Sequence, residues 1–375
     1  MVERDSVRDA IINAAEGKHN RRGVRRALGD IEGTIDSTLA ALADGTWRPD
    51  TYQESQINEG SYRKNRTIYR PKWECEQIVH HMIVNELKTI MTPRLYPHAY
   101  GSLSTNKVRM IGGIPVVTRH GQHHLAKTLH KWVHEYGNKR FYVAELDISK
   151  FYASVSKDTL LQLLRKSIRD KLYVDTVAYA IEPFEGLPLG NILSPWLANF
   201  YLMGMDEYIL QQLKPDHYAR YMDNLWLMCT NKRKLHHMVK NLTKWLYNER
   251  GLTFGRSRQV FRFEDAKMHE KDGKQYRAGR AMNAVGFVIH RDRICIRKSI
   301  LCRARRRATR IGRKAWVTWY DAMRFVSSLT YMRHANVYGY YTRHITSNVK
   351  PRVCKMLAAQ HQRKVAMLRG RERIE

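Results

Sequence analysis

The chain has 375 residues, of which 43% are hydrophobic, so it can bury a full core and, by the usual domain length, form two or three domains. Its 66 Lys and Arg residues against 35 Asp and Glu give a formal net charge of +31, which indicates a polyanionic partner, with nucleic acid the first candidate. No apolar run reaches the roughly 20 residues that span a bilayer, and the charged N-terminus has no signal-peptide core, so we expect a cytoplasmic protein without a membrane partner.

The first part of the chain has a helical pattern. Between Asp5 and Ala43 the apolar residues recur at spacings of three and four on either side of a basic stretch, Gly17–Gly23, which predicts two helices joined by a basic turn. Ser61–Tyr69 predicts two short strands joined by a second basic turn. After Pro71 the apolar residues return to helical spacing and predict a buried helix.

One group of histidines resembles a metal site. His130 and His134 lie four residues apart in a helical stretch, with His120, His123 and His124 just upstream. Because this spacing offers no complete ligand set, we interpret the group as a solvated or RNA-facing surface. The five cysteines contain no CxxC pair, which indicates reduced thiols and neither a disulfide framework nor a zinc ribbon.

The middle of the chain places a carboxylate at the end of a strand. Phe141–Ile148 predicts a strand that includes Asp147, and Ser156 marks the start of an amphipathic helix after it. Gly186–Gly190 predicts a tight loop that allows close approach of a substrate. A helix from about Pro195 follows.

A second carboxylate is predicted at the tip of a β-hairpin. His217–Tyr221 and Leu225–Cys229 are strand-like runs that flank Asp223. Two carboxylates at strand ends, Asp147 and Asp223, are what two-metal nucleotidyl transfer needs, because acidic oxygen ligands hold two Mg²⁺ ions about 4 Å apart. A helix to about Glu249 and a further hairpin come next, and the rest of the chain is predicted to be helical and basic.

These motifs resemble the sequence blocks of bacterial retroelement-type reverse transcriptases, a family that includes group II intron, diversity-generating and defence-associated enzymes. The resemblance runs from about residue 39 to about residue 344. Five blocks occur in the order of the family: Asp147–Val155, Gly186–Pro195, Arg220–Asn224, Gly251–Phe254 and Val285–Phe287.

The resemblance implies an α+β right-hand polymerase with fingers, a palm built on an antiparallel sheet, and a helical thumb. The expected domains are an N-terminal helical extension (1–55), fingers and palm (56–290), and a basic thumb with a C-terminal tail (291–375). The implied enzyme is an RNA-directed DNA polymerase, a nucleotidyltransferase that takes dNTPs, an RNA template and its DNA product. We expect the template to be a dedicated non-coding RNA, and an accessory protein or a homo-oligomer stays open.

The resemblance also assigns roles at the catalytic centre. Asp147 and Asp223 are expected to ligate both Mg²⁺ ions, with the carbonyl of Ile148 completing one shell. Asn224 replaces the second Asp of the family's hairpin tip, so we expect retained but slower activity with Mn²⁺ favoured. Tyr152 matches the aromatic residue under the sugar, where its ring would collide with a 2′-hydroxyl and select deoxynucleotides.

Four further residues are expected to bind substrate. Arg66 and, less directly, Lys64 match the fingers position that meets the incoming triphosphate. Gly190 allows the backbone to approach the template base pair. Arg258 lies near the family's general-acid lysine and would act as a charge clamp, because a guanidinium scarcely deprotonates.

The segment from Arg297 to Lys314 holds nine basic residues and no acidic one. We expect a thumb helix that contacts duplex phosphates without reading sequence. Its predicted nucleic-acid contacts are Arg297, Lys298, Arg303, Arg306, Arg310 and Arg313. For most of the aromatic residues nearby we expect packing in a helical core, and the set is Trp316, Trp319, Tyr320, Tyr331, Tyr338, Tyr340 and Tyr341.

The cellular role has two alternatives within the family. Relatives that diversify proteins usually carry Gln after the Ser of the glycine block, whereas Pro195 follows Ser194 here. This difference favours anti-phage defence over a diversity-generating retroelement. A catalytically weakened RNA-binding scaffold is the alternative from another class, supported by Asn224, Leu189 and Arg258, and RNA synthesis is a third.

Overall fold

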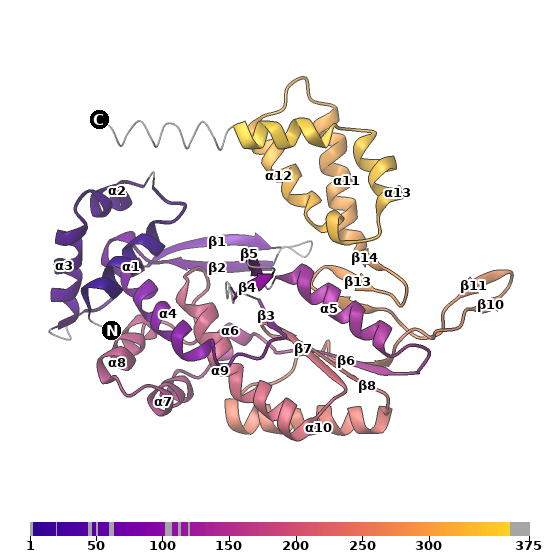
Figure 1. Ribbon diagram of the computed structural model, residues 1–375, viewed down its shortest axis with the longest axis horizontal. Coiled ribbons are helices and arrows are strands. Elements are labelled where there is room, and N and C mark those ends of the chain that lie inside the picture. The colour runs from indigo at the N-terminus through magenta and orange to yellow at the C-terminus, as the bar shows by residue number, and fades with distance from the viewer. Residues whose placement is uncertain are drawn as a thin grey trace. The chain divides into compact units, whose positions relative to one another are not determined.

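The computed structural model of the chain describes residues 3–19, 21–43, 47–49, 52–59, 64–101, 107–111, 114–118 and 121–360. These residues form two compact units (Figure 1). The first unit comprises Met1–Arg119 and Ala144–Gln259, and the second comprises His120–Val143 and Val260–Glu375. Among the described residues, no helix combines the length and apolar character needed to cross a bilayer.

The N-terminal part of the first unit holds three helices where the sequence pattern predicted two. They are α1 (Arg4–Ala15), α2 (Arg22–Gly29) and α3 (Ile31–Ala43), and α1 packs on α4 (Ile78–Met91). The additional break falls at Asp30, whose carboxylate accepts a hydrogen bond from the Gly33 N–H at 2.9 Å. This side chain caps α3 and ends the preceding helix.

A long β-hairpin follows, in a register that the sequence pattern did not predict. The strand β1 (Gln53–Glu59) pairs antiparallel with β2 (Lys64–Arg70), from Gln53 opposite Arg70 to Glu59 opposite Lys64. The prediction of two strands within Ser61–Tyr69 was therefore wrong, because Lys64–Arg70 is one strand and its partner lies upstream. The residues of β1 are almost all polar, so they lack the alternation by which a strand is recognised.

The central five-stranded sheet has the order β3-β7-β8-β6-β9. Its strands are β3 (Ala99–Tyr100), β6 (Tyr142–Asp147), β7 (His217–Tyr221), β8 (Asn224–Cys229) and β9 (Gln259–Arg262). The strands β7 and β8 form the predicted antiparallel hairpin, and β3 runs parallel to β7. A separate hairpin pairs β4 (Lys107–Ile111) with β5 (Ile114–Thr118).

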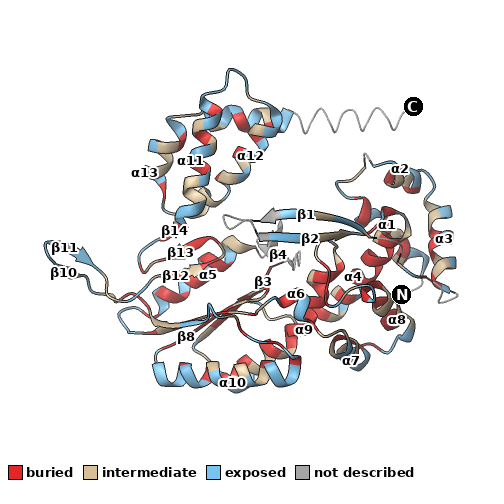
Figure 2. Ribbon diagram, turned by 180° about the vertical axis from the view of Figure 1, so that it is seen from behind, coloured by how far each residue is buried: buried red, intermediate tan, exposed pale blue. Residues whose placement is uncertain are grey.

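The helices around this sheet differ in how many of their residues are buried. Figure 2 shows that α4 and α9 are largely buried, whereas α10 exposes much of its surface. The helices after the strand β6 are α6 (Phe151–Ser154), α7 (Lys157–Ser167), α8 (Lys171–Ile181), α9 (Leu193–Tyr208) and α10 (Lys232–Arg250). The predicted Ser156 cap is present, since its hydroxyl accepts a hydrogen bond from the Thr159 N–H at 3.2 Å.

The second unit combines short antiparallel strands with helices. Its strands are β10 (His269–Lys271), β11 (Lys274–Tyr276), β12 (Met282–Ala284), β13 (Phe287–Ile289) and β14 (Ile294–Ile296). Its helices are α5 (Gln122–Glu135), α11 (Lys298–Gly312), α12 (Trp319–Leu329) and α13 (Tyr338–Tyr341). The core between α11 and α12 includes Ala304, Ala308 and Phe325.

The aromatic residues of this unit differ from their predicted packing. Trp316 and Tyr338 are 78% and 82% exposed, and Trp319 and Tyr320 are also exposed. The expectation of a helical core is therefore wrong for these four. Small alanines and one phenylalanine fill the seam between α11 and α12, which leaves the larger rings outside it.

Gly312 ends α11 where only glycine fits. A Cβ at this position would lie 2.2 Å from the carbonyl oxygen of Asn348, a backbone atom that cannot swing away. We predict that Gly312→Ala destabilises the protein by about 1–3 kcal/mol, the usual cost of overpacking. Urea unfolding followed by circular dichroism measures the change.

Gly339→Ala is the matched control, because its Cβ would have 3.5 Å of clearance in α13 of the same unit. It should be neutral or slightly stabilising through helix propensity. Equal stability of the two variants would contradict the packing of α11 described above.

Candidate active site

The structure brings the two predicted catalytic aspartates to the same end of the central sheet. Asp147 ends β6, and Asp223 lies in the tight turn between β7 and β8, next to β6 in the strand order. The N–H of Ile148 donates a hydrogen bond to the carbonyl oxygen of Asp223 at 3.0 Å. The two carboxylates are therefore held by a direct backbone link between their segments.

A third segment holds Asp147 from its other side. The N–H of Ser149 donates to the carbonyl of Thr253 at 2.8 Å, and the N–H of Gly255 donates to the carbonyl of Asp147 at 2.7 Å. A Cβ on Gly255 would lie 3.4 Å from the Asp147 carboxylate. Sequence reasoning identified Gly251–Phe254 as a block but missed Gly255, the glycine that follows it.

The carboxyl group of Asp223 is partly buried. Burial raises the pKa of its carboxyl, while the hydrogen bond from the Asn224 side-chain N–H and the positive charges of Arg66 and Arg220 act in the opposite direction and only partly offset it. Asn224 donates this hydrogen bond through Nδ2 at 3.0 Å. The amide therefore faces its neighbour as a donor, in the place where the family's hairpin tip has a second carboxylate.

Two of the predicted substrate-binding side chains lie beside Asp223. Burial raises the pKa of both Asp223 and Tyr152, and the positive charge of the exposed Arg66, on β2, opposes that rise in each case. The negative charge of Asp223 raises the pKa of Tyr152 further. Lys64 also belongs to β2, but its side chain lies outside the described residues. The structure thus groups a cation, a phenol and a carboxylate.

The glycine loop connects the segments that carry Tyr152 and Arg66. The N–H of Leu187 donates to the carbonyl of Tyr152 at 2.8 Å, and a Cβ on Gly186 would lie 2.5 Å from that carbonyl oxygen. Near the other end of the loop, the carbonyl of Leu189 accepts a hydrogen bond from the N–H of Tyr69, on β2, at 2.7 Å. The loop therefore binds α6 at one end and the β1–β2 hairpin at the other.

Gly190 is required by a contact within the chain. Its φ of +107° lies in a region that favours glycine, and a Cβ would lie 2.1 Å from Cγ2 of Ile68 on β2. The close neighbour that the structure shows at this glycine is β2. Contact with a template base pair stays a prediction.

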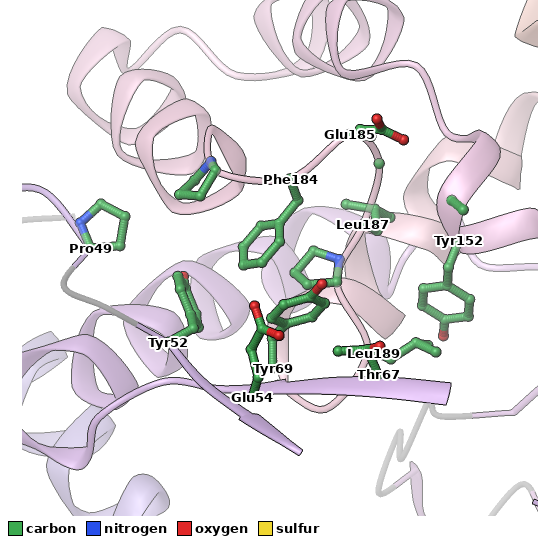
Figure 3. A pocket seen from close by; sticks show the side chains of 14 residues that line it. Pro49, Tyr52, Glu54, Thr67, Tyr69, Tyr152, Phe184, Glu185, Leu187 and Leu189 are labelled. Carbon is green, nitrogen blue, oxygen red and sulfur yellow. The ribbon is translucent and has the colours of Figure 1, made fainter. Parts of the chain in front are cut away.

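A pocket of about 690 Å³ opens behind the tyrosine of α6. Figure 3 shows the ring of Tyr152 beside Leu189 and Thr67, with Tyr52, Tyr69 and Phe184 further along the wall. Phe184 meets each of the two tyrosines edge to face, with ring centroids 4.9 Å apart. These aromatic residues come from separate strands and loops, so no local pattern in the sequence marks them.

The remaining predicted residues of this site are less closely engaged. Ile148 is buried and uses its N–H for the bond to Asp223, and the role of its carbonyl as a metal ligand stays a prediction. Arg258 is exposed in the turn after Gly255, whose carbonyl accepts its backbone N–H at 3.3 Å. Its assignment as a charge clamp stays a prediction.

The predicted basic helix is present as α11 in the second unit. Its apolar side is closed by Ala304, Ala308 and Ile311, which face the core. All six predicted nucleic-acid-binding residues are exposed: Arg297, Lys298, Arg303, Arg306, Arg310 and Arg313. Residues 297–360 contain 15 Lys and Arg residues and one acidic residue, Asp321, which pairs with Lys314 at 2.5 Å.

The histidine group does not form a recognisable metal site. The rings of His130 and His134 contact each other with centroids 4.5 Å apart, and His123 stacks on His334 at 4.1 Å. His120 lies outside the described residues. Where the structure describes the chain, it holds no group of three or more His, Cys, Asp or Glu side chains arranged to hold a metal ion.

The raised pKa of Asp223 leads to a prediction for the metal-free protein. Because the folded state holds the carboxyl proton more tightly than the unfolded chain, this group's contribution to stability is present at low pH and is lost as pH rises through the folded pKa. At pH 7 and without metal, Asp223→Asn should therefore have a higher Tm than wild type. Addition of Mg²⁺ should raise the Tm of wild type but not the Tm of Asp223→Asn.

Thermal unfolding at pH 7 and near pH 4, with and without Mg²⁺, checks this expectation, and the difference should shrink at the lower pH. Asp9→Asn, at an exposed position of α1, is the control and should leave the Tm unchanged. A lower Tm for Asp223→Asn in metal-free buffer at pH 7 would refute the electrostatic description of the site.

Comparisons with known proteins agree with this geometry. Residues 63–261 match the reverse transcriptase (RNA-dependent DNA polymerase) family. Over 197 residues the chain is 26% identical to the group II intron-encoded protein LtrA of Lactococcus lactis subsp. cremoris, and the match covers 49% of this chain and 30% of that protein. The chain thus spans less than a third of the length of this curated relative, and LtrA of strain MG1363 gives the same values.

Among solved structures, the chain is similar to telomerases at low sequence identity. Apo telomerase from Candida tropicalis has 9% identity and a TM-score of 0.47, covering 75% of this chain and 52% of that one. Telomerase from Candida albicans, in complex with a TWJ fragment of telomeric RNA, has 10% identity and a TM-score of 0.47, with coverages of 82% and 58%.

The family match extends over more than half of the chain and includes the segments of Asp147, the glycine loop and Asp223. It confirms the predicted fold class, an α+β right-hand polymerase. The chain belongs to the reverse transcriptase (RNA-dependent DNA polymerase) family.

Proposed function

We propose that the chain synthesises DNA on an RNA template, with two divalent metal ions held by Asp147 and Asp223. The observation that carries the proposal is the backbone bond from Ile148 to Asp223, which sets both carboxylates at one sheet end. Arg66 and Tyr152 lie close enough to influence, or be influenced by, the charge of Asp223. This combination fits nucleotidyl transfer in a chain of the reverse transcriptase family.

The donor set of the site fits magnesium or manganese. The positive charges of Arg66 and Arg220 only partly offset the burial of the Asp223 carboxylate, and a divalent cation would offset the remainder. Asp147 and Asp223 would hold the ions, with the carbonyl of Ile148 as an additional oxygen ligand. When bound, such ions lower the pKa of the primer hydroxyl and neutralise the leaving pyrophosphate.

Asn224 distinguishes this site from the family's usual hairpin tip. Its Nδ2 donates to Asp223, so it adds no negative charge for a second ion. The proposed consequence is retained but slower synthesis, with Mn²⁺ preferred over Mg²⁺. An all-oxygen site of lower charge binds a hard cation less tightly.

The chain's own side chains would select and orient the nucleotide. Arg66 presents a guanidinium, which suits triphosphate oxygens, and Arg258 would clamp pyrophosphate. Tyr152 would exclude a 2′-hydroxyl by steric contact. The hydrogen bonds of the glycine loop to Tyr152 and Tyr69 keep the gate and the triphosphate-binding strand in one assembly.

The exposed cations of α11 support the proposed nucleic-acid partners. Guanidinium groups on one helix face suit the phosphates of an RNA template paired with its DNA product. We further propose that the template is a dedicated non-coding RNA and that the role is anti-phage defence. The residue that supports defence over a diversity-generating retroelement is Pro195, directly after Ser194.

Primer extension tests the polymerase proposal directly. Wild type should extend an RNA-templated primer with dNTPs, whereas Asp147→Ala and Asp223→Ala should each lose about 10³-fold or more in rate, since each removes several kcal/mol of transition-state stabilisation. Both Mg²⁺ and Mn²⁺ are supplied, and RNA that co-purifies with the chain is sequenced and used as a template.

Asp158→Ala, in the first turn of α7, is the control and should retain activity. If wild type extends no template, including the co-purified RNA, the polymerase proposal is lost. Retained RNA binding in that case would favour the RNA-binding scaffold.

The sugar gate has its own test. Tyr152→Ala should gain use of NTPs by roughly tenfold or more relative to dNTPs, because removal of the ring leaves room for a 2′-hydroxyl. Tyr152→Phe keeps the ring and should keep the preference of wild type for dNTPs. Relative kcat/KM for matched dNTP and NTP pairs measures the effect, and an unchanged ratio in Tyr152→Ala would remove the gate assignment.

A further inference from the structure

An ion pair is buried directly behind the catalytic hairpin. Arg220, on β7, is 0% exposed, and Asp206, on α9, is 3% exposed. The guanidinium donates through Nε to Oδ1 of Asp206 at 2.9 Å and through Nη2 to Oδ2 at 2.6 Å. The hydroxyl of Tyr218 donates to the same Oδ1 at 2.6 Å. The carboxylate thus has three hydrogen bonds in the interior.

The remaining nitrogen of Arg220 is directed at the tip of the hairpin. Its Nη1 donates to the side-chain oxygen of Asn199 at 2.8 Å and to the carbonyl oxygen of Met222 at 3.2 Å. Met222 immediately precedes Asp223, and its φ of +54° lies in the left-handed region that bulky residues rarely adopt. Arg220 therefore bonds the residue whose conformation sets the course of the turn.

Other groups close around the same methionine. The N–H of Met222 donates to the carbonyl of Tyr100 on β3 at 3.2 Å, and Nδ2 of Asn199 lies 3.4 Å from its sulfur. A Cβ on Gly101 would lie 2.9 Å from Cγ of Met222. The methionine is thus held from β3, β7 and α9, directly before Asp223 in the turn.

We propose that Arg220 is a positioning residue for the catalytic carboxylate. By holding the carbonyl of Met222 in the left-handed turn, it fixes the direction in which Asp223 leaves the hairpin. The inference rests on the proposed function, because it assigns Arg220 to the same metal-binding site. An ion pair in a protein interior is weak evidence for stability, since apolar replacement of both partners is often neutral or stabilising.

Removing both charges separates positioning from folding. Arg220→Met combined with Asp206→Asn leaves no unpaired buried charge, and the new amide oxygen can still accept the hydroxyl of Tyr218. We expect a Tm close to that of wild type. Mn²⁺ binding, titrated by electron paramagnetic resonance without nucleotides, should weaken about tenfold, and the rate of dNTP addition should fall tenfold to a hundredfold, as a misplaced group does.

Tyr173→Phe is the control for stability alone. Its hydroxyl donates to the carbonyl of Ile83 at 2.9 Å and so joins α8 to α4, two elements outside the β7–β8 hairpin. Its Tm should fall while Mn²⁺ affinity stays that of wild type. If the charge-free double variant binds Mn²⁺ as wild type does, the positioning role is refuted, and this readout stands even if wild type shows no polymerase activity.

A double-mutant cycle tests whether Arg220 acts through Met222. Glycine adopts positive φ without steric cost, so in the background of Met222→Gly the turn depends less on an external clamp. Arg220→Met combined with Asp206→Asn should therefore weaken Mn²⁺ binding by a smaller factor in the Met222→Gly protein than in the wild-type protein. An equal or larger factor would mean that Arg220 does not act through the conformation of Met222.

Discussion

The hydrogen bond from the Ile148 N–H to the Asp223 carbonyl joins two segments that each carry a negative charge to one end of a sheet. Like charges repel more strongly where water is partly excluded. Backbone bonds must therefore hold the aspartates in place before any cation arrives. The bonds of Ser149 and Gly255 to the neighbouring segment add two further restraints on Asp147. The positive charges of Arg66 and Arg220 and the hydrogen bond from Asn224 also reduce the cost of the negative charge on Asp223.

The glycine loop adds a second set of backbone bonds, between the segments that carry Tyr152 and Arg66. It bonds the Tyr152 carbonyl through Leu187 and the Tyr69 N–H through Leu189, so α6 and β2 are linked through three consecutive residues. A Cβ on Gly186 would collide with the carbonyl of Tyr152, and a Cβ on Gly190 would collide with the side chain of Ile68 on β2. The proposed gate, Tyr152, and the proposed triphosphate ligand, Arg66, thus depend on one short backbone segment. A shift of the loop would move both.

Local patterns in the sequence were sufficient to predict the elements that carry the proposed catalytic residues. The strand ending in Asp147, the hairpin around Asp223 and the glycine loop each have a signal within about ten residues, namely alternation, turn chemistry or glycine spacing. The strand β1 lacked such a signal because it is polar, and its pairing with Lys64–Arg70 arises only in three dimensions. The partner of Arg220 comes from α9, a separate element. The exposure of Trp316 and Tyr338 follows from how alanines close the α11–α12 seam, which composition alone does not reveal.

Asn224 can be understood from the same electrostatic constraint. A carboxylate at this position would add a third negative charge beside Asp147 and Asp223, and the metal-free fold would be less stable for it. The amide instead donates to Asp223 at 3.0 Å and lowers the cost of its charge. The same donation competes with a cation for the electron pairs of that carboxylate. In the proposed metal site, Asn224 would lower the affinity for metal and stabilise the metal-free hairpin. The hydrogen bond from Arg220 to Met222 would then matter more, because fewer negative charges would be available to orient the ions.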